Sequence, residues 1–321
     1  MTEDPQMPDT NGTVADAVKD NWVDRFAPAP TRPFLRLSRA DRPIGTWLLY
    51  APCLWGLSLA VLATDRYSDH DVWTIVGCGL GAFLMRGAGC TWNDVTDRHI
   101  DGSVARTRAR PIPSGQVTVK AALIWMVVQA LLAFFILISF YPTAIFLGIL
   151  ALLPVAISPH AKRFTLGPQA FLGSAFNWGS LLAGAAHTNS IGPVPIVLYL
   201  ACIAWTLFYD TIYAYQDAED DALIGVKSTA RLFGEDARRW LRLFMTITIV
   251  LFGLAVVLAA SDRSMLSLVI AIGGPWALGW HLTWQLSRFD PEDTDGLLRI
   301  FRSNREAGLI PLPFFAIALM V

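Results

Sequence analysis

The chain has 321 residues, of which 54% are hydrophobic and 16% are charged, against about 25% charged in an average soluble domain. The net charge is −1 and there are four cysteines. These values exclude a disordered chain, a basic protein with nucleic acid as its partner, and a disulfide scaffold. What remains is an all-α, polytopic membrane protein that has the lipid bilayer as its surroundings.

The N-terminal segment differs in composition from the rest of the chain. Residues 1–38 are predicted to form a polar cytoplasmic tail, and residues 39–321 a transmembrane domain. The tail has no apolar core of the kind that a secretory signal requires. Its first 24 residues hold six acids and one base, which argues against an Arg-rich, acid-poor mitochondrial transit peptide.

Apolar stretches long enough to cross about 30 Å of hydrocarbon recur through the transmembrane domain. A final stretch, 307–321, covers only about 22 Å at 1.5 Å per residue. We therefore expect about nine transmembrane helices, eight of full length and one shorter. The eight full-length spans are predicted at 44–63, 72–91, 119–140, 142–159, 169–187, 193–213, 243–260 and 264–286.

The basic residues are distributed asymmetrically over the predicted loops. If the N-terminus lies in the cytoplasm, 22 of the 25 Lys and Arg residues fall in cytoplasmic segments. Arg66 and Arg263 lie in the opposite loops, and Arg86 lies inside a span. The positive-inside rule therefore predicts a cytoplasmic N-terminus.

The first acid-rich block follows the second predicted span. If that helix continues past the membrane surface, Asp94, Asp97 and Asp101 lie at i, i+3 and i+7 on one face. Like charges so arranged repel one another unless a cation neutralises them. Arg106, Arg108 and Arg110 follow, as expected for a site that binds an anion through a metal ion.

A second block about 120 residues later repeats this pattern. It contains Asp210, Tyr213, Asp217 and Asp221, again at helical spacing, and Lys227 follows. Oxygen ligands without Cys or His, next to basic residues, point to Mg²⁺ holding a diphosphate. An ordinary juxtamembrane loop of mixed charge explains one such block more readily than two. The repetition suggests acid-rich helix ends that face each other.

Arg86 is the one formal cation in the interior of a predicted span, and such residues are functional hypotheses by default. It lies seven residues before Asn93, and therefore on the same helix face. Arg86 or Arg39 is expected to hold a substrate carboxylate. The alternatives are that Arg86 contacts diphosphate or forms an internal ion pair. Asn177, also within a span, is expected to hydrogen-bond either a substrate or a neighbouring helix.

These motifs resemble the UbiA superfamily of intramembrane prenyltransferases. Residues 93–101 match its NDxxDxxxD signature, and residues 209–230 resemble its second motif in the form typical of 4-hydroxybenzoate polyprenyltransferases. Residues 41–47, 106–115, 162–165 and 176–179 are also similar, whereas the tail is not. The sequence departs from the family at Ser158, where a tyrosine is common, which puts a phenol-based role at that site in doubt.

The resemblance implies that the helices surround a central cavity. It also implies a Mg²⁺-dependent enzyme that transfers a prenyl group from a polyprenyl diphosphate to the ring of 4-hydroxybenzoate, ortho to its hydroxyl, in ubiquinone synthesis. We expect it in a bacterial inner membrane with the active site toward the cytoplasmic face. The implied catalytic carboxylates are Asp94, Asp97, Asp217 and Asp221, which with Asp101 would bind the metal. The implied substrate-binding residues are Arg39, Arg86, Asn93, Asp101, Arg106, Arg110, Lys162, Asn177, Asp210, Tyr213 and Lys227.

Three other interpretations stay open at this point. Another member of the superfamily would use homogentisate, a naphthoate, heme or chlorophyllide as acceptor. A secondary transporter would also have many helices and an intramembrane arginine, but its charged site usually lies near the midplane. A scaffolding membrane protein would leave both acid blocks unexplained.

Overall fold

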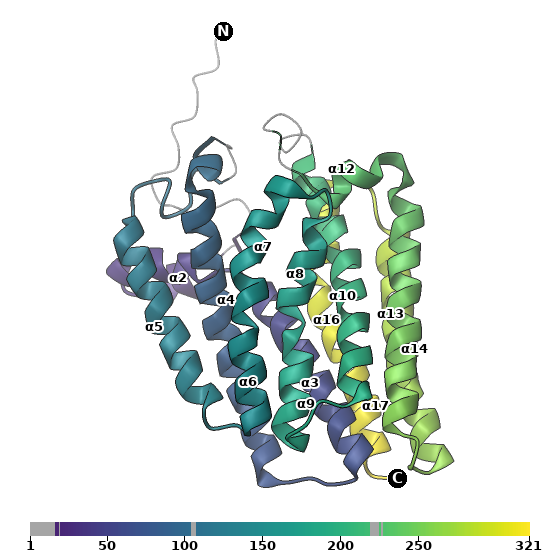
Figure 1. Ribbon diagram of the computed structural model, residues 1–321. Helices are drawn as coiled ribbons and strands as arrows, with labels where there is room; N and C mark the ends of the chain where they lie inside the picture. The colour runs from purple at the N-terminus through teal and green to yellow at the C-terminus, as the bar shows by residue number, and fades with distance from the viewer. Residues whose placement is uncertain (1–16, 19, 104–106, 219–224, 226) are drawn as a thin grey trace. The chain divides into compact units, whose positions relative to one another are not determined.

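The computed structural model describes residues 17–18, 20–103, 107–218, 225 and 227–321. In these ranges all regular structure is helical (Figure 1). Two compact units can be separated, one of residues 1–45 and 83–133 and the other of residues 46–82 and 134–321. The predicted boundary between a tail at 1–38 and a domain at 39–321 stays a prediction.

The first unit combines short N-terminal helices with parts of two long ones. α1 (Trp22–Phe26), the 3₁₀ turn η1 (Ala29–Thr31) and α2 (Arg32–Leu37) precede the start of α3 (Ile44–Thr64). Asn21 caps α1 through a bond from the Asp24 amide, and Pro33 stands in the first turn of α2, where its missing N–H costs nothing. The unit then takes in the later part of α4 (Asp69–Ser103) and most of α5 (Val119–Leu137).

The length of α4 confirms that this helix continues beyond the predicted span at 72–91. Its 35 residues extend about 50 Å, well over the 30 Å of a hydrocarbon layer. The first acid block is therefore helical, as its spacing predicted.

The second unit is a helical bundle. Within it, α10 (Pro193–Ala214) packs on α13 (Ala237–Ala259), and α13 packs on α14 (Met265–Ser287), so that these three lie side by side (Figure 1). α7 (Leu152–Phe164) packs on α8 (Pro168–Phe176), and α6 (Pro142–Leu150) on α9 (Trp178–Thr188). The remaining elements are η2 (Tyr215–Asp217), α12 (Thr229–Phe233), η3 (Gly234–Asp236), α15 (Thr294–Arg302), α16 (Asn304–Leu309) and α17 (Pro311–Ala318).

Seven helices of the described chain are long and apolar enough to cross a membrane. The polytopic all-α class is thus confirmed, but the count of nine is not. The predicted span 169–187 is divided at Asn177 into α8 and α9, each too short to cross alone. The last span is similarly divided into α16 and α17, since Pro311 starts a new helix. Hydropathy does not register such breaks, because the residues that make them are few.

Candidate active site

The first acid block lies on the buried face of α4, within the first unit. Asp94, Asp97 and Asp101 are 0%, 1% and 5% exposed, whereas His99 on another face is exposed. Asn93 is half-buried. Buried carboxylates need charge partners or a metal, because transferring an isolated charge out of water is costly.

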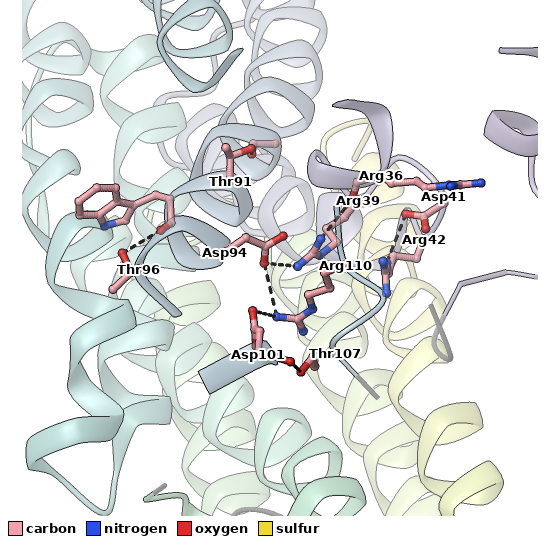
Figure 2. Close-up of polar contacts among 12 residues, drawn as sticks. Arg36, Arg39, Asp41, Arg42, Thr91, Asp94, Thr96, Asp101, Thr107 and Arg110 are labelled. Atoms are coloured by element: carbon pink, nitrogen blue, oxygen red, sulfur yellow. Dashed lines mark hydrogen bonds and ion pairs between the residues drawn. The ribbon is translucent and has the colours of Figure 1, made fainter. Parts of the chain in front are cut away.

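Two arginines form ion pairs with Asp94 and Asp101 (Figure 2). Arg39 Nη2 donates to Asp94 Oδ1 at 2.5 Å, and Arg110 Nη1 lies 2.8 Å from Asp101 Oδ2 and 3.4 Å from Asp94 Oδ1. Burial acts to lower the pKa of Arg39, but Asp94 outweighs it and raises that pKa above its ordinary value. Arg39 is therefore charged, and Arg110 bridges two acids that lie two helical turns apart.

One carboxylate oxygen of Asp94 takes no part in this network. Its Oδ2 is buried and has no hydrogen-bond partner among the described residues. A buried, charged oxygen without a donor is a costly arrangement and a fitting ligand for a hard cation. The part of the chain that the structure describes contains no cluster of three or more His, Cys, Asp or Glu side chains placed to hold a metal ion. Asp221 and Arg106 lie outside it.

Arg86 lies against the start of α3. A Cβ atom added at Gly45 would come within 2.5 Å of Arg86 Nη2 and closer still to Nε and Cζ, so only glycine leaves room for this guanidinium. Residues 41–47 were singled out as a motif, and this contact supplies a physical reason for its glycine. Whether Arg86 holds a carboxylate, contacts diphosphate or forms an internal ion pair stays a prediction.

The turn before α3 carries a second buried ion pair. Arg42 Nε lies 3.2 Å from Asp41 Oδ1, and both residues are less than 10% exposed. Burial raises the pKa of Asp41 to about 6. Nearer the N-terminus, Arg36 binds Asp24 at 2.7 Å; burial acts to raise the pKa of Asp24, but bonds from Arg36 and Asn21 lower it overall.

The second block lies at the end of α10, within the second unit. Asp210 and Asp217 are half-buried. The Tyr213 ring packs on Phe301 of α15 with centroids 4.3 Å apart, and Tyr215 packs on Phe289. Both tyrosines thus have a packing role within the bundle. That the two acid blocks face each other stays a prediction.

Lys162 and Lys227, predicted from separate loops, are brought together within the second unit. The Lys227 amide donates to the Lys162 carbonyl oxygen at 3.3 Å, and Lys227 Nζ lies 3.3 Å from the carbonyl oxygen of Phe164. Gln169, which sequence reasoning missed, accepts the Thr229 amide at 3.2 Å and so secures the segment after Lys227. In the sequence it shows only as an amide side chain within an apolar stretch, which does not say what that amide binds.

Asn177 forms the break between α8 and α9 and is fully buried. Its Nδ2 donates to Thr206 Oγ1 at 2.7 Å and to the Gly173 carbonyl oxygen at 2.8 Å. This bears out the expected bond to a neighbouring helix, since Thr206 belongs to α10. A bond from Asn177 to a substrate stays a prediction.

Comparison with known proteins adds the decisive observation. Residues 49–304 match the UbiA prenyltransferase family, which is most of the chain. The chain is a member of the UbiA prenyltransferase family. Among solved structures, a UbiA homologue from Aeropyrum pernix has a TM-score of 0.67 at 20% identity, covering 84% of this chain and 97% of that one. A UbiA homologue from Archaeoglobus fulgidus, solved with GPP and Mg²⁺, has a TM-score of 0.63 at 18% identity, covering 90% of this chain and 100% of that one.

Curated members of the UbiA family are more similar in sequence. The mitochondrial 4-hydroxybenzoate polyprenyltransferase of Bos taurus is 42% identical over 90% of this chain and 76% of its own length. The enzyme of the same name from Arabidopsis thaliana is 40% identical over 95% of this chain and 74% of its own length.

These relatives correct one expectation. A bacterial inner membrane was expected, but the curated relatives from mammals, a plant, insects and a slime mould are mitochondrial proteins. The expectation failed because the asymmetry of basic residues reports on which side of a bilayer the loops lie. It carries no information on which membrane that bilayer is. The multi-pass architecture is unaffected.

Proposed function

We propose that the chain transfers a polyprenyl group from polyprenyl diphosphate to the ring of 4-hydroxybenzoate, ortho to the hydroxyl, and releases diphosphate, as a step of ubiquinone synthesis. The observation that carries this proposal is the identity of about 40%, over nine-tenths of the chain, to enzymes with that name. The same names point to a mitochondrial membrane.

Mg²⁺ is the proposed cofactor, and the unpartnered Oδ2 of Asp94 supports it. Asp94, Asp97, Asp101, Asp217 and Asp221 would hold it. Bound Mg²⁺ neutralises diphosphate and so makes it a better leaving group. The UbiA homologue from Archaeoglobus fulgidus with GPP and Mg²⁺ supports the choice of metal.

The chain's own residues then bind and orient the two substrates. Arg110, Arg106, Lys162 and Lys227 donate to the diphosphate oxygens, since charge-assisted bonds to phosphate are strong. Arg39 holds Asp94 Oδ1 and leaves Oδ2 directed away from the pair. Arg86 pairs with the benzoate carboxylate. Asn93, Asp210, Tyr213 and Asn177 complete the proposed substrate contacts.

Exclusion of water is the remaining requirement, because water would otherwise capture the allylic cation left by departing diphosphate. The burial of the acid block on α4 supports such exclusion. The ring proton ortho to the hydroxyl is lost after attack, and no described side chain is assigned as its acceptor.

The test mixes membranes containing the chain with 4-hydroxybenzoate, a polyprenyl diphosphate and Mg²⁺, and measures prenylated benzoate by mass spectrometry of lipid extracts. Product should form, and both EDTA and Asp94→Ala should abolish it, whereas Asp290→Ala, which removes an exposed acid, should not. Folded protein that makes no product would refute the acceptor, and homogentisate and a naphthoate would be tried next.

A further inference from the structure

Arg39 stands in a turn whose backbone is both strained and buried. It has φ +57°, in the left-handed region that residues with a side chain seldom adopt. Ser38, Arg39, Ala40, Asp41 and Arg42 are all less than 7% exposed. Irregular backbone so deeply buried persists only when its surroundings hold it in place.

The residues on either side of Arg39 are held by different helices. The Trp22 indole of α1 donates to the Ala40 carbonyl oxygen at 2.9 Å. On the other side, the Ser38 hydroxyl accepts a bond from the Trp125 indole at 2.8 Å and lies 2.9 Å from Gln129 Oε1. Trp125 and Gln129 both belong to α5, so α5 fixes one end of the turn.

Gln129 is an unusual residue for its position. It lies ten residues into α5, about 15 Å along a helix that is otherwise apolar after Lys120, and is 2% exposed. An amide there costs free energy unless it is hydrogen-bonded. Its Oε1 faces α4 at Gly87, where an added Cβ would lie 2.9 Å from Gln129 Cδ and overlap Oε1. Gly87 stands seven residues before Asp94 on the same helix.

We propose that Gln129 is a positioning residue: it holds Ser38, and through Ser38 it keeps the left-handed Arg39 in the place from which its guanidinium binds Asp94 Oδ1. Oδ2 of Asp94, the oxygen that would bind Mg²⁺, is then oriented by a network that begins on α5. This inference rests on the proposed function for the role of Asp94 in metal binding. The contacts among Gln129, Ser38, Arg39 and Asp94 are independent of that function.

The test compares Gln129→Met, which keeps the length and removes the acceptor, with Gln129→Glu, which keeps an acceptor oxygen. Val128→Met, at a half-exposed neighbour on the same helix, is the matched control. Hydrogen exchange, read by mass spectrometry, follows the Ala40 and Arg42 amides, which bond to Leu35 and Arg39 within the turn. The Mg²⁺ concentration that gives half-maximal prenyl transfer is measured in parallel with the KM for 4-hydroxybenzoate.

For Gln129→Met we expect exchange about fivefold faster, the change that loss of one hydrogen bond produces. The Mg²⁺ requirement should rise by a similar factor while the KM for 4-hydroxybenzoate stays unchanged. Gln129→Glu should restore most of both, and Val128→Met should change neither. In an Arg39→Ala background, Gln129→Met should add nothing to the Mg²⁺ requirement.

Unchanged hydrogen exchange in Gln129→Met would overturn the inference, and so would an unchanged Mg²⁺ requirement. It would also be overturned if Gln129→Met raised the Mg²⁺ requirement as much in the Arg39→Ala background as in the wild type. Failure of the proposed function is separate, because the wild-type chain would then make no product while the exchange comparison still tests the turn.

Discussion

Replacing Gly45 with alanine is the sharpest test of the role given to Arg86. The new Cβ would lie 2.5 Å from Arg86 Nη2, where ordinary contact begins at 3.4 Å, so the guanidinium has to move by about 1 Å or more. The backbone itself gains, since Gly45 is the second residue of α3 and alanine is the better helix former. Loss of activity would therefore not come from loss of the helix.

The size of the effect follows from the bond that Arg86 is proposed to make. A hydrogen bond to a charged group contributes about 1.5–3 kcal/mol, which is about 10- to 150-fold in binding. A displacement of about 1 Å in a positioned group can cost a similar factor. We expect Gly45→Ala to raise the KM for 4-hydroxybenzoate by about 10- to 100-fold and to leave the KM for polyprenyl diphosphate within about twofold.

Steady-state kinetics in detergent or nanodiscs would measure both constants. Gly89→Ala is the matched control, because this glycine is also helical, lies on the same helix as Arg86, and has open space where its Cβ would be. A KM for 4-hydroxybenzoate that stays at the wild-type value in Gly45→Ala would refute the assignment of Arg86 to the carboxylate. A rise only in the KM for polyprenyl diphosphate would show that Arg86 binds the diphosphate instead of the carboxylate.

Three further predictions concern stability and the acid network. The pKa of Asp41 is about 6 in the folded protein, against 3.8 otherwise, so the ionisation of Asp41 disfavours the fold. This destabilisation is absent below pH 3.8, grows as the pH rises toward 6 and reaches about 3 kcal/mol. Asp41→Asn should therefore gain thermal stability over the wild type as the pH rises from 4 to 7, and parallel pH profiles of the two melting temperatures would argue against this reasoning. Arg110→Lys should weaken diphosphate binding by about tenfold in a competition assay with inorganic pyrophosphate, since a lysine side chain is shorter and lacks the guanidinium Nη1 that contacts both Asp94 and Asp101; equal affinity would show that the bridge is dispensable. Thr206→Val should destabilise the second unit by about 1–3 kcal/mol in thermal unfolding, because it removes the acceptor of the buried Asn177 amide, whereas Thr246→Val, at an exposed threonine of α13, should not.

Part of the site was predictable because its signals are local. A seven-residue spacing of acids defines a helix face wherever the helix continues, and α4 does continue to Ser103. The breaks at Asn177 and Ile310 were not predictable from hydropathy, since a single asparagine or an interior proline hardly changes an apolar average. Nor was Gln169, whose importance depends on which amide lies opposite it.

The sequence by itself determined that this protein crosses a bilayer many times and which acids lie on one face, because composition and period act through nearest neighbours along the chain. Only the tertiary structure decided which cations neutralise those acids. Arg39 is 55 residues from Asp94, and its place depends on a left-handed turn held by Trp22, Trp125 and Gln129. Such pairings depend on the distance between side chains in space, which no pattern along the chain encodes.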